Sequence, residues 1–104
     1  AEITRLKPIV FHPDAAEEAH DAADYYEGQR QGLGHDFRQS LGAALSRVRQ
    51  NPQWFAIVSG NIRACSLHRF PFSVYFEELA DKIWIAGVGH QSRRPGYWKF
   101  RRPN

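Results

Sequence analysis

The sequence has a single cysteine, Cys65, so no disulfide bond can form within the chain. It also lacks the run of about 18 apolar residues that a membrane-spanning helix requires. Its first ten residues contain no apolar run preceded by a basic segment, the pattern of a signal peptide. These absences exclude a disulfide scaffold, and they lead us to expect a soluble protein in the reducing cytoplasm.

Signals for a metal or a cofactor are equally scarce. The five histidines and the lone cysteine show no metal-ligand spacing. Two Gly-x-Gly pieces, Gly32–Gly34 and Gly87–Gly89, lack the rest of the phosphate-binding fingerprint and its strand-to-helix setting. We expect turns or close-packing positions there, and we expect neither a metal nor a cofactor.

Length and charge suggest one domain with an anionic partner. A compact core normally accounts for roughly 100 to 150 residues, so residues 1–104 are expected to form a single domain. Residues 1–50 hold 8 acidic residues against 6 Lys and Arg, whereas residues 51–104 hold 3 against 8. This asymmetry predicts that the second half binds either a nucleic acid or an acidic protein segment.

A helical hairpin is predicted for the first half. Pro13 suits the first position of a helix, and an apolar stripe then continues to about Gln29. The stripe consists of Ala15, Ala19, Ala22 and Tyr26. A second stripe runs from Leu33 until Asn51-Pro52 ends it. The acidic residues of the first helix spread around its circumference, so we expect a solvated surface from Asp14, Glu17, Glu18, Asp21, Asp24 and Glu27.

The remainder predicts strands. Residues 6–12 resemble a short strand. Because proline cannot donate a ladder hydrogen bond, Pro8 favours either an edge position for this strand or a place at the strand's first residue. Three further β-rich runs cover residues 62–70, 72–78 and 82–90. Residues 83–88 are apolar on both faces, so this strand should be central. The order predicts an α+β fold, in which an N-terminal strand, a helical hairpin and a three-stranded antiparallel meander place the helices on one face of the sheet.

Residues 91–104 are expected to form a basic, aromatic tail. Between Arg93 and Arg102, five of ten residues are cationic and three are aromatic. Such a mixture can neutralise phosphates and offer rings for base stacking, or it can anchor a protein contact. Alternatively, Tyr97 and Trp98 fold back onto the sheet as part of the core, and the arginines are merely solvated.

A candidate basic face draws on two predicted strands and on the tail. Its members are Arg63, His68, Arg69, His90, Arg93 and Arg94. If the strands are neighbours, these side chains could converge in one concave surface. A metal-free RNA cleavage site needs a base, an acid and cations around the phosphate, and this set supplies part of that need. A strand histidine is, however, more often a hydrogen-bonded structural residue than a catalyst.

Short segments in a fixed order give a family resemblance. They are Asp24-Tyr25-Tyr26-Glu27, Gly32-Leu33-Gly34 with Phe37, Asn51-Pro52, Arg69-Phe70-Pro71-Phe72-Ser73-Val74-Tyr75-Phe76, and Val88 to His90 followed by Arg93 to Trp98. Over roughly residues 11–98 this set resembles the RelE/ParE toxin superfamily, in its ParE-like, plasmid-stabilisation branch. The resemblance implies the fold predicted above and a cognate, ParD-like antitoxin that wraps the toxin in a hetero-oligomer. It also implies a target in DNA topology or in translation.

Two departures separate the sequence from RelE-type nucleases. Those nucleases usually carry an arginine after the first aromatic residue of the third strand, where Ser73 stands here. They also use lysines on the second strand, and residues 61–70 contain none, although Arg63 and Arg69 could partly substitute. Both departures favour a ParE-like toxin that binds DNA gyrase without chemistry of its own.

Three functions are therefore carried forward. The first is a gyrase-binding toxin that an antitoxin neutralises, with a binding surface formed by Arg63, Arg69, His90, Arg93, Arg94, Tyr97 and Trp98. The second is a ribosome-dependent mRNA endonuclease, whose candidate catalytic residues are Arg63, His68, Arg69, Arg93 and Tyr97. The third is a non-toxic module that binds nucleic acid or protein, which the charge asymmetry alone supports. We expect the antitoxin to lay an amphipathic segment against the helical hairpin or a sheet edge, with its acids facing the arginines.

Overall fold

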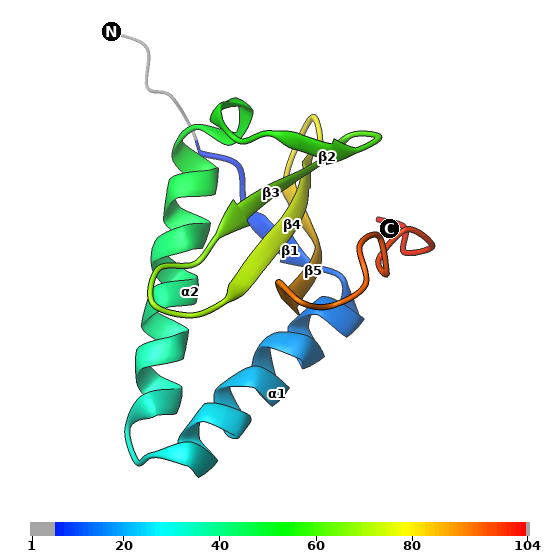
Figure 1. Ribbon diagram of the computed structural model, residues 1–104. Coiled ribbons are helices and arrows are strands. Elements are labelled where there is room, and N and C mark those ends of the chain that lie inside the picture. Colours follow the sequence, from blue (N-terminus) through cyan, green and yellow to red (C-terminus); the bar gives the residue numbers. More distant parts are fainter. Residues whose placement is uncertain (1–5, 104) are drawn as a thin grey trace, which may run out of the picture.

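A five-stranded sheet carries two helices on one face and the C-terminal segment on the other (Figure 1). The computed structural model describes residues 6–103. The elements are β1 (Ile9–Phe11), α1 (Pro13–Gln29), α2 (Leu33–Gln50), a 3-10 turn (Pro52–Trp54), β2 (Ile57–Ser59), β3 (Ile62–Ser66), β4 (Phe72–Glu78) and β5 (Ile83–His90). The strand order is β1-β5-β4-β3-β2, with β1 parallel to β5 and all other neighbours antiparallel. The predicted α+β fold is confirmed.

The helical hairpin follows the predicted bounds. α1 begins at Pro13, where His12 accepts a hydrogen bond from the backbone N–H of Asp14 through Nδ1, at 3.0 Å. Glu27 accepts hydrogen bonds from the N–H groups of Gly32 and Gly34, so its carboxylate caps the start of α2. At Gly34 a Cβ atom would lie 2.7 Å from the carbonyl oxygen of Ala23, so glycine lets the two helices approach closely.

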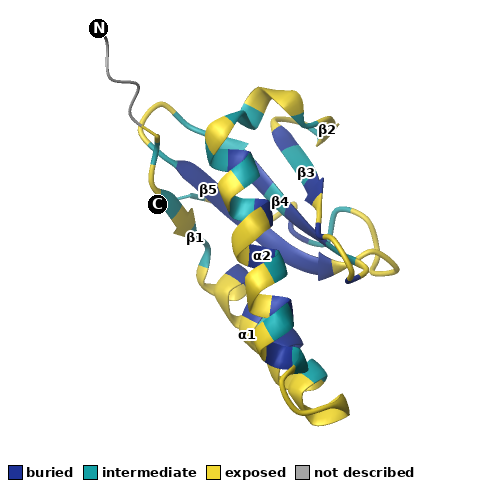
Figure 2. Ribbon diagram, turned by 90° about the vertical axis from the view of Figure 1, so that its left-hand side faces the viewer, coloured by how far each residue is buried: buried dark blue, intermediate teal, exposed yellow. Residues whose placement is uncertain are grey.

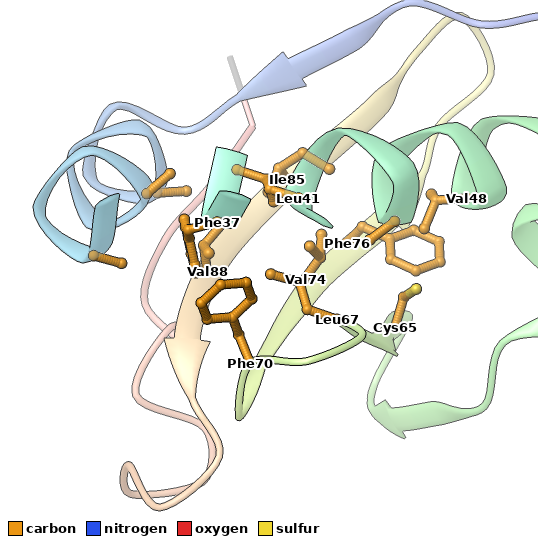
Figure 3. Close-up of a cluster of buried hydrophobic side chains, with 14 of the residues drawn as sticks. Phe37, Leu41, Val48, Cys65, Leu67, Phe70, Val74, Phe76, Ile85 and Val88 are labelled. Carbon is orange, nitrogen blue, oxygen red and sulfur yellow. The ribbon is translucent and has the colours of Figure 1, made fainter. Parts of the chain in front are cut away.

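The main core lies between the helical hairpin and the sheet. In Figure 3, Phe37, Leu41 and Val48 of α2 lie over Val74 and Phe76 of β4. α1 contributes small side chains to this core, namely Ala15, Ala19, Ala22 and Ala23. Because these side chains are short, the helix can pack close to the sheet, and Figure 2 shows its buried side turned inward.

The strands differ from the prediction in three ways. β2 was not predicted, because a three-residue edge strand with two exposed apolar residues has no period to detect. β3 ends at Ser66, so the predicted continuation to residue 70 is wrong, and residues 67–71 form a loop. β5 is an interior strand with both faces buried, as predicted, but β4 takes the middle place. β1 lies at the sheet edge, and Pro8 directly precedes it.

A bulge in β5 decides which of its residues face the C-terminal segment. The register with β4 shifts between Tyr75 and Phe76, so that Tyr75 pairs with Gly87 but Phe76 pairs with Ile85. Ile85 and Val88 consequently both belong to the helix-side core, although they are three residues apart. After the shift, Gly87 and Gly89 face the other side of the sheet, where the C-terminal segment packs.

Within the described residues, none of the helices is long and apolar enough to cross a membrane.

Candidate functional site

The carboxylate of Glu18, on α1, gathers polar groups from the C-terminal segment. Arg101 donates two hydrogen bonds to it, from Nη1 to Oε1 at 3.0 Å and from Nη2 to Oε2 at 2.9 Å. Arg93 donates a third, from Nη1 to Oε2 at 2.9 Å, and the Tyr97 hydroxyl lies 3.3 Å from Oε1. We call Glu18, Arg93, Tyr97 and Arg101 the Glu18 cluster. It fastens the end of the chain to the first helix through a bidentate, charge-assisted pair.

The Glu18 cluster also completes the backbone pairing of β5. β1 pairs with β5 only over Ile83–Ile85, and no other strand among residues 6–103 lies along the rest of that edge. The N–H of Val88 donates to Glu18 Oε1 at 3.0 Å, and the carbonyl of Ala86 accepts from Arg101 Nη1 at 2.9 Å. An acid and a base thus replace the missing strand and keep these buried backbone groups paired.

The surroundings of the cluster shift three pKa values. Burial alone would raise the pKa of Glu18, but the hydrogen bonds from Arg101 and Val88 and the charges of Arg101 and Arg93 outweigh it and lower that pKa. Burial raises the pKa of Tyr97, and the neighbouring Glu18 charge raises it further. The hydrogen bond to Glu18 raises the pKa of Arg101. At neutral pH the carboxylate is therefore ionised and the phenol is protonated.

Tyr97 and Trp98 fold back onto the sheet, which is the alternative given above for the aromatic residues. A Cβ atom on Gly87 would lie 2.7 Å from the Tyr97 hydroxyl, and one on Gly89 would approach it still more closely. The Gly-x-Gly piece is thus a close-packing site, as expected. Trp98 is 5% exposed and packs with Ile62, Trp84 and Ala86 in a second core. Arg93 covers the Tyr97 ring, with Cζ 3.6 Å from the ring centroid.

The prediction that the basic residues converge on one concave face is wrong for the set as a whole. Of the six, only His90 and Arg93 line a common hollow, together with Glu18. Arg63 Nη1 donates to the carbonyl of Phe55 at 2.7 Å. Arg69 lies in the β3–β4 loop, where its Nη2 is 3.5 Å from Asp36 Oδ2. Only Arg93, of these three, reaches Glu18. Each arginine therefore has its own partner in a different part of the fold.

The strand register explains this separation. Arg63 pairs with Phe76, whose ring belongs to the helix-side core, so Arg63 extends from the face opposite the C-terminal segment. His90 pairs with Phe72, which lies four residues along β4 from Phe76, the partner of Arg63. Four strand residues span about 13 Å. Because β3 ends at Ser66, Arg69 is not on a strand and does not share the face that was predicted for it.

The remaining predicted residues are exposed. His68 lies in the β3–β4 loop, and its backbone carbonyl accepts a hydrogen bond from the Ser40 hydroxyl. His90 ends β5, where its Nδ1 accepts from the N–H of Ser92 at 3.0 Å and its ring meets the edge of Phe72. Arg94 is exposed and makes no hydrogen bond or ion pair with any residue from 6 to 103. Neither histidine therefore makes a contact that suggests a catalytic role.

Glu18 and Arg101 were missed at the sequence level. Glu18 was expected on a solvated surface, and this is wrong, because its side chain is 14% exposed. One signal was available, since Ala15, Glu18 and Ala22 stand three and four residues apart and so border the same buried side of α1. Nothing in the sequence distinguishes Arg101 from its exposed neighbour Arg102.

Two adjoining hollows form a groove between the β2–β3 turn and the C-terminal segment. The first has a volume of about 280 Å³ and the second of about 300 Å³, and they share Ser59, Trp98 and Lys99. We call this feature the tail groove. Its first hollow is lined by Val58, Ser59, Tyr75, Gln91, Arg93, Pro95, Gly96, Trp98 and Lys99. Across the described part of the chain, no three His, Cys, Asp or Glu side chains gather in a group that could hold a metal ion.

The fold is also found in a protein of known structure. The fold is similar to that of a solved structure described as a chromosomal ParDE TA system from P. aeruginosa, with a TM-score of 0.72 and 18% identity. The match covers 84% of this chain and 98% of that chain, and at this identity it shows the fold. No curated protein sequence matches the chain.

The sequence itself identifies the family. Residues 9–95 match the family described as ParE toxin of type II toxin-antitoxin system, parDE. The chain belongs to this family and is a ParE-type toxin of a type II toxin–antitoxin system, so the resemblance noted in the sequence is confirmed.

Proposed function

We propose that this toxin arrests growth by binding DNA gyrase, and that a cognate antitoxin neutralises it by binding the toxin. The observation that carries the choice of a binding mechanism is the pairing within the Glu18 cluster. The Tyr97 hydroxyl and both Arg101 amino groups point at Glu18, so they are engaged with one carboxylate. Groups that are bonded to a carboxylate in this way are not free to hold a substrate phosphate.

The same groups are poorly suited to RNA cleavage. A general base should have a pKa near the working pH, but the pKa of Tyr97 is raised and that of Glu18 is lowered. Ser73, at the position where RelE-type nucleases usually carry an arginine, is 6% exposed. These observations support inhibition by binding over the mRNA endonuclease alternative.

Exposed cations and rings on the C-terminal segment provide a surface for a macromolecular partner. Phe100 is 92% exposed, and the Arg93 side chain is 45% exposed despite its ion pair. Arg94 and Lys99 are exposed beside them. Arginine and aromatic side chains are the residues that most often carry binding energy at protein interfaces.

A supercoiling assay tests this function directly. Purified toxin at micromolar concentration should inhibit supercoiling of relaxed plasmid by gyrase or trap cleaved DNA, and added antitoxin should restore activity. Arg94→Gln should weaken the inhibition, whereas Arg30→Gln, which removes the same charge at the helical hairpin, serves as the matched control. A clean lack of effect on gyrase contradicts the proposal. Codon-linked cuts in toeprints of translating ribosomes would instead favour the endonuclease.

A further inference from the structure

The tail groove has an aromatic floor and an apolar wall. The rings of Tyr75 and Trp98 lie 5.4 Å apart at a tilt of 33° and line the first hollow. Val58 of β2, which is 50% exposed, and Pro95 of the C-terminal segment also line it. A side chain that entered this hollow would exchange water for apolar contacts on several sides.

The first hollow is lined by cations and by no acid, although one of the cations, Arg93, is paired with Glu18 outside the lining. None of the residues that line it is Asp or Glu, and two are cations, Arg93 and Lys99. The Lys99 ammonium group makes no hydrogen bond or ion pair with any other residue that the structure describes. The Tyr75 hydroxyl likewise has no hydrogen-bond partner there. The hollow therefore offers donors that are free to receive an anionic group.

We propose that the tail groove binds an acidic, aliphatic segment of a partner protein, with an apolar side chain against Val58 and Trp98 and a carboxylate at Lys99 and Arg93. The inference deepens the proposed function and rests on it, since that function requires a bound protein partner. It adds the place on the toxin and the chemistry of the partner segment that occupies it.

Size and charge favour a peptide over a nucleic acid. The first hollow, at about 280 Å³, is slightly smaller than the roughly 300–1,000 Å³ typical of small-molecule pockets, so it suits one or two side chains. The two hollows together are lined by four cations, Arg93, Lys99, Arg101 and Arg102, but Arg93 and Arg101 are already paired with Glu18. Proteins that track nucleic acid rely on many phosphate contacts, often about six to ten, whereas only two cations of the groove, Lys99 and Arg102, are not paired with Glu18.

NMR titration of the intact chain tests the proposal, because the three tryptophans report different places. The probe is an acetylated, amidated hexapeptide of alternating Glu and Leu, followed through ¹H–¹⁵N spectra. We expect the indole signal of Trp98 to shift, while that of Trp54, which is 80% exposed and lines neither hollow, stays in place. A hexapeptide of alternating Gln and Leu should bind at least about fivefold more weakly, since it loses the charge pairing.

Neighbouring residues of β2 give matched variants. Val58 lines the first hollow, whereas Ile57 is similarly exposed, at 55%, but does not line it. Val58→Glu should abolish the Trp98 shift, because it places a carboxylate on the wall, and Ile57→Glu should preserve it. Lys99→Gln should weaken binding by about fivefold, and Arg30→Gln should not change it. Unchanged amide spectra outside the groove will show that each variant is folded.

The outcomes are separable. The proposal is overturned if the Glu-Leu peptide does not shift Trp98, if Val58→Glu and Ile57→Glu behave alike, or if hexauridylate binds the groove and the peptide does not. Growth arrest with antitoxin rescue, measured independently, would then keep the proposed function while the groove loses its assigned role. Conversely, peptide binding without gyrase inhibition would retain the groove and reject the target.

Discussion

Glu18 and Arg101 face each other through two nearly equal hydrogen bonds, 3.0 and 2.9 Å long, across 83 positions of sequence. Each side chain is 14% exposed, and each also pairs with the otherwise unpaired edge of β5. The contact therefore joins three distant parts of the chain, namely the first helix, the last strand and the C-terminal segment. Loss of either partner removes the bidentate pair and leaves the other charge with a single ion pair, from Arg93 to Glu18 or from Asp14 to Arg101.

Removal of the Glu18 carboxylate should destabilise the fold. Glu18→Ala leaves Arg101 without its bidentate partner and the Val88 N–H without its acceptor, so we expect a loss of about 3 kcal/mol in the free energy of unfolding. Glu17→Ala, at an exposed neighbouring position, should change it by less than about 0.5 kcal/mol. Urea denaturation measures both. Equal stability of the two variants would mean that the ion pair contributes nothing.

Stability should fall in acid because of Glu18. Its pKa is lowered in the folded protein, so its contribution is fully present above the unfolded value of 4.5 and is lost as the pH falls through the folded value. Glu78, whose pKa the hydrogen bond from Lys7 lowers, adds a contribution of the same sign. Melting temperatures between pH 7 and pH 3 should decline less in Glu18→Gln than in the native chain. Parallel declines in the two proteins would contradict this assignment.

Two glycine substitutions should have opposite effects. Gly89→Ala drives a Cβ atom into the Tyr97 ring, and it should cost about 1–3 kcal/mol and loosen the C-terminal segment. Gly42→Ala lies within α2, where a Cβ atom meets nothing within 4 Å, and it should stabilise the protein by up to about 1 kcal/mol. Thermal denaturation gives both signs, and limited proteolysis reports the release of the segment. A tolerated alanine at Gly89 would show that the Tyr97 packing adapts easily.

The features that sequence predicted well depend on neighbours close in the chain. The apolar stripe of α1 repeats within a few residues, and the continuous apolar run of β5 indicates burial on both faces. The convergence of Arg63 and Arg69 with Arg93 depended instead on strand ends and register. The residues near Ser66 do not indicate that β3 ends there, and those of β5 do not indicate where its register shifts.

The Glu18 cluster could not be predicted for the same physical reason. Its partners are 75 to 83 positions apart, and charge counts treat each side chain as equally exposed. The acidic first half and the basic second half, which suggested an external anionic partner, partly neutralise each other within the molecule. The exposed cations left over, such as Lys99, are those on which the binding proposals depend.

Arg69 combines a strained backbone with a predicted role in binding, and paired substitutions separate the two. Its φ of 74° lies in the left-handed region, which costs a non-glycine residue roughly 1 kcal/mol. Arg69→Gly and Arg69→Ala both remove the contact with Asp36, but only glycine relieves the backbone. We expect the glycine variant to be more stable than the alanine variant by about 1 kcal/mol in urea denaturation.

Toxicity should follow the side chain and not the backbone. If Arg69 contacts the target, both variants should reduce growth arrest equally, because both lack the guanidinium group. If the loop conformation matters instead, toxicity should track stability, and Arg69→Gly should remain the more toxic of the two. Growth curves after induction from a tight promoter, with protein levels matched by immunoblot, distinguish these outcomes. Full toxicity of both variants would remove Arg69 from the target-binding surface and leave it as a loop residue held by Asp36.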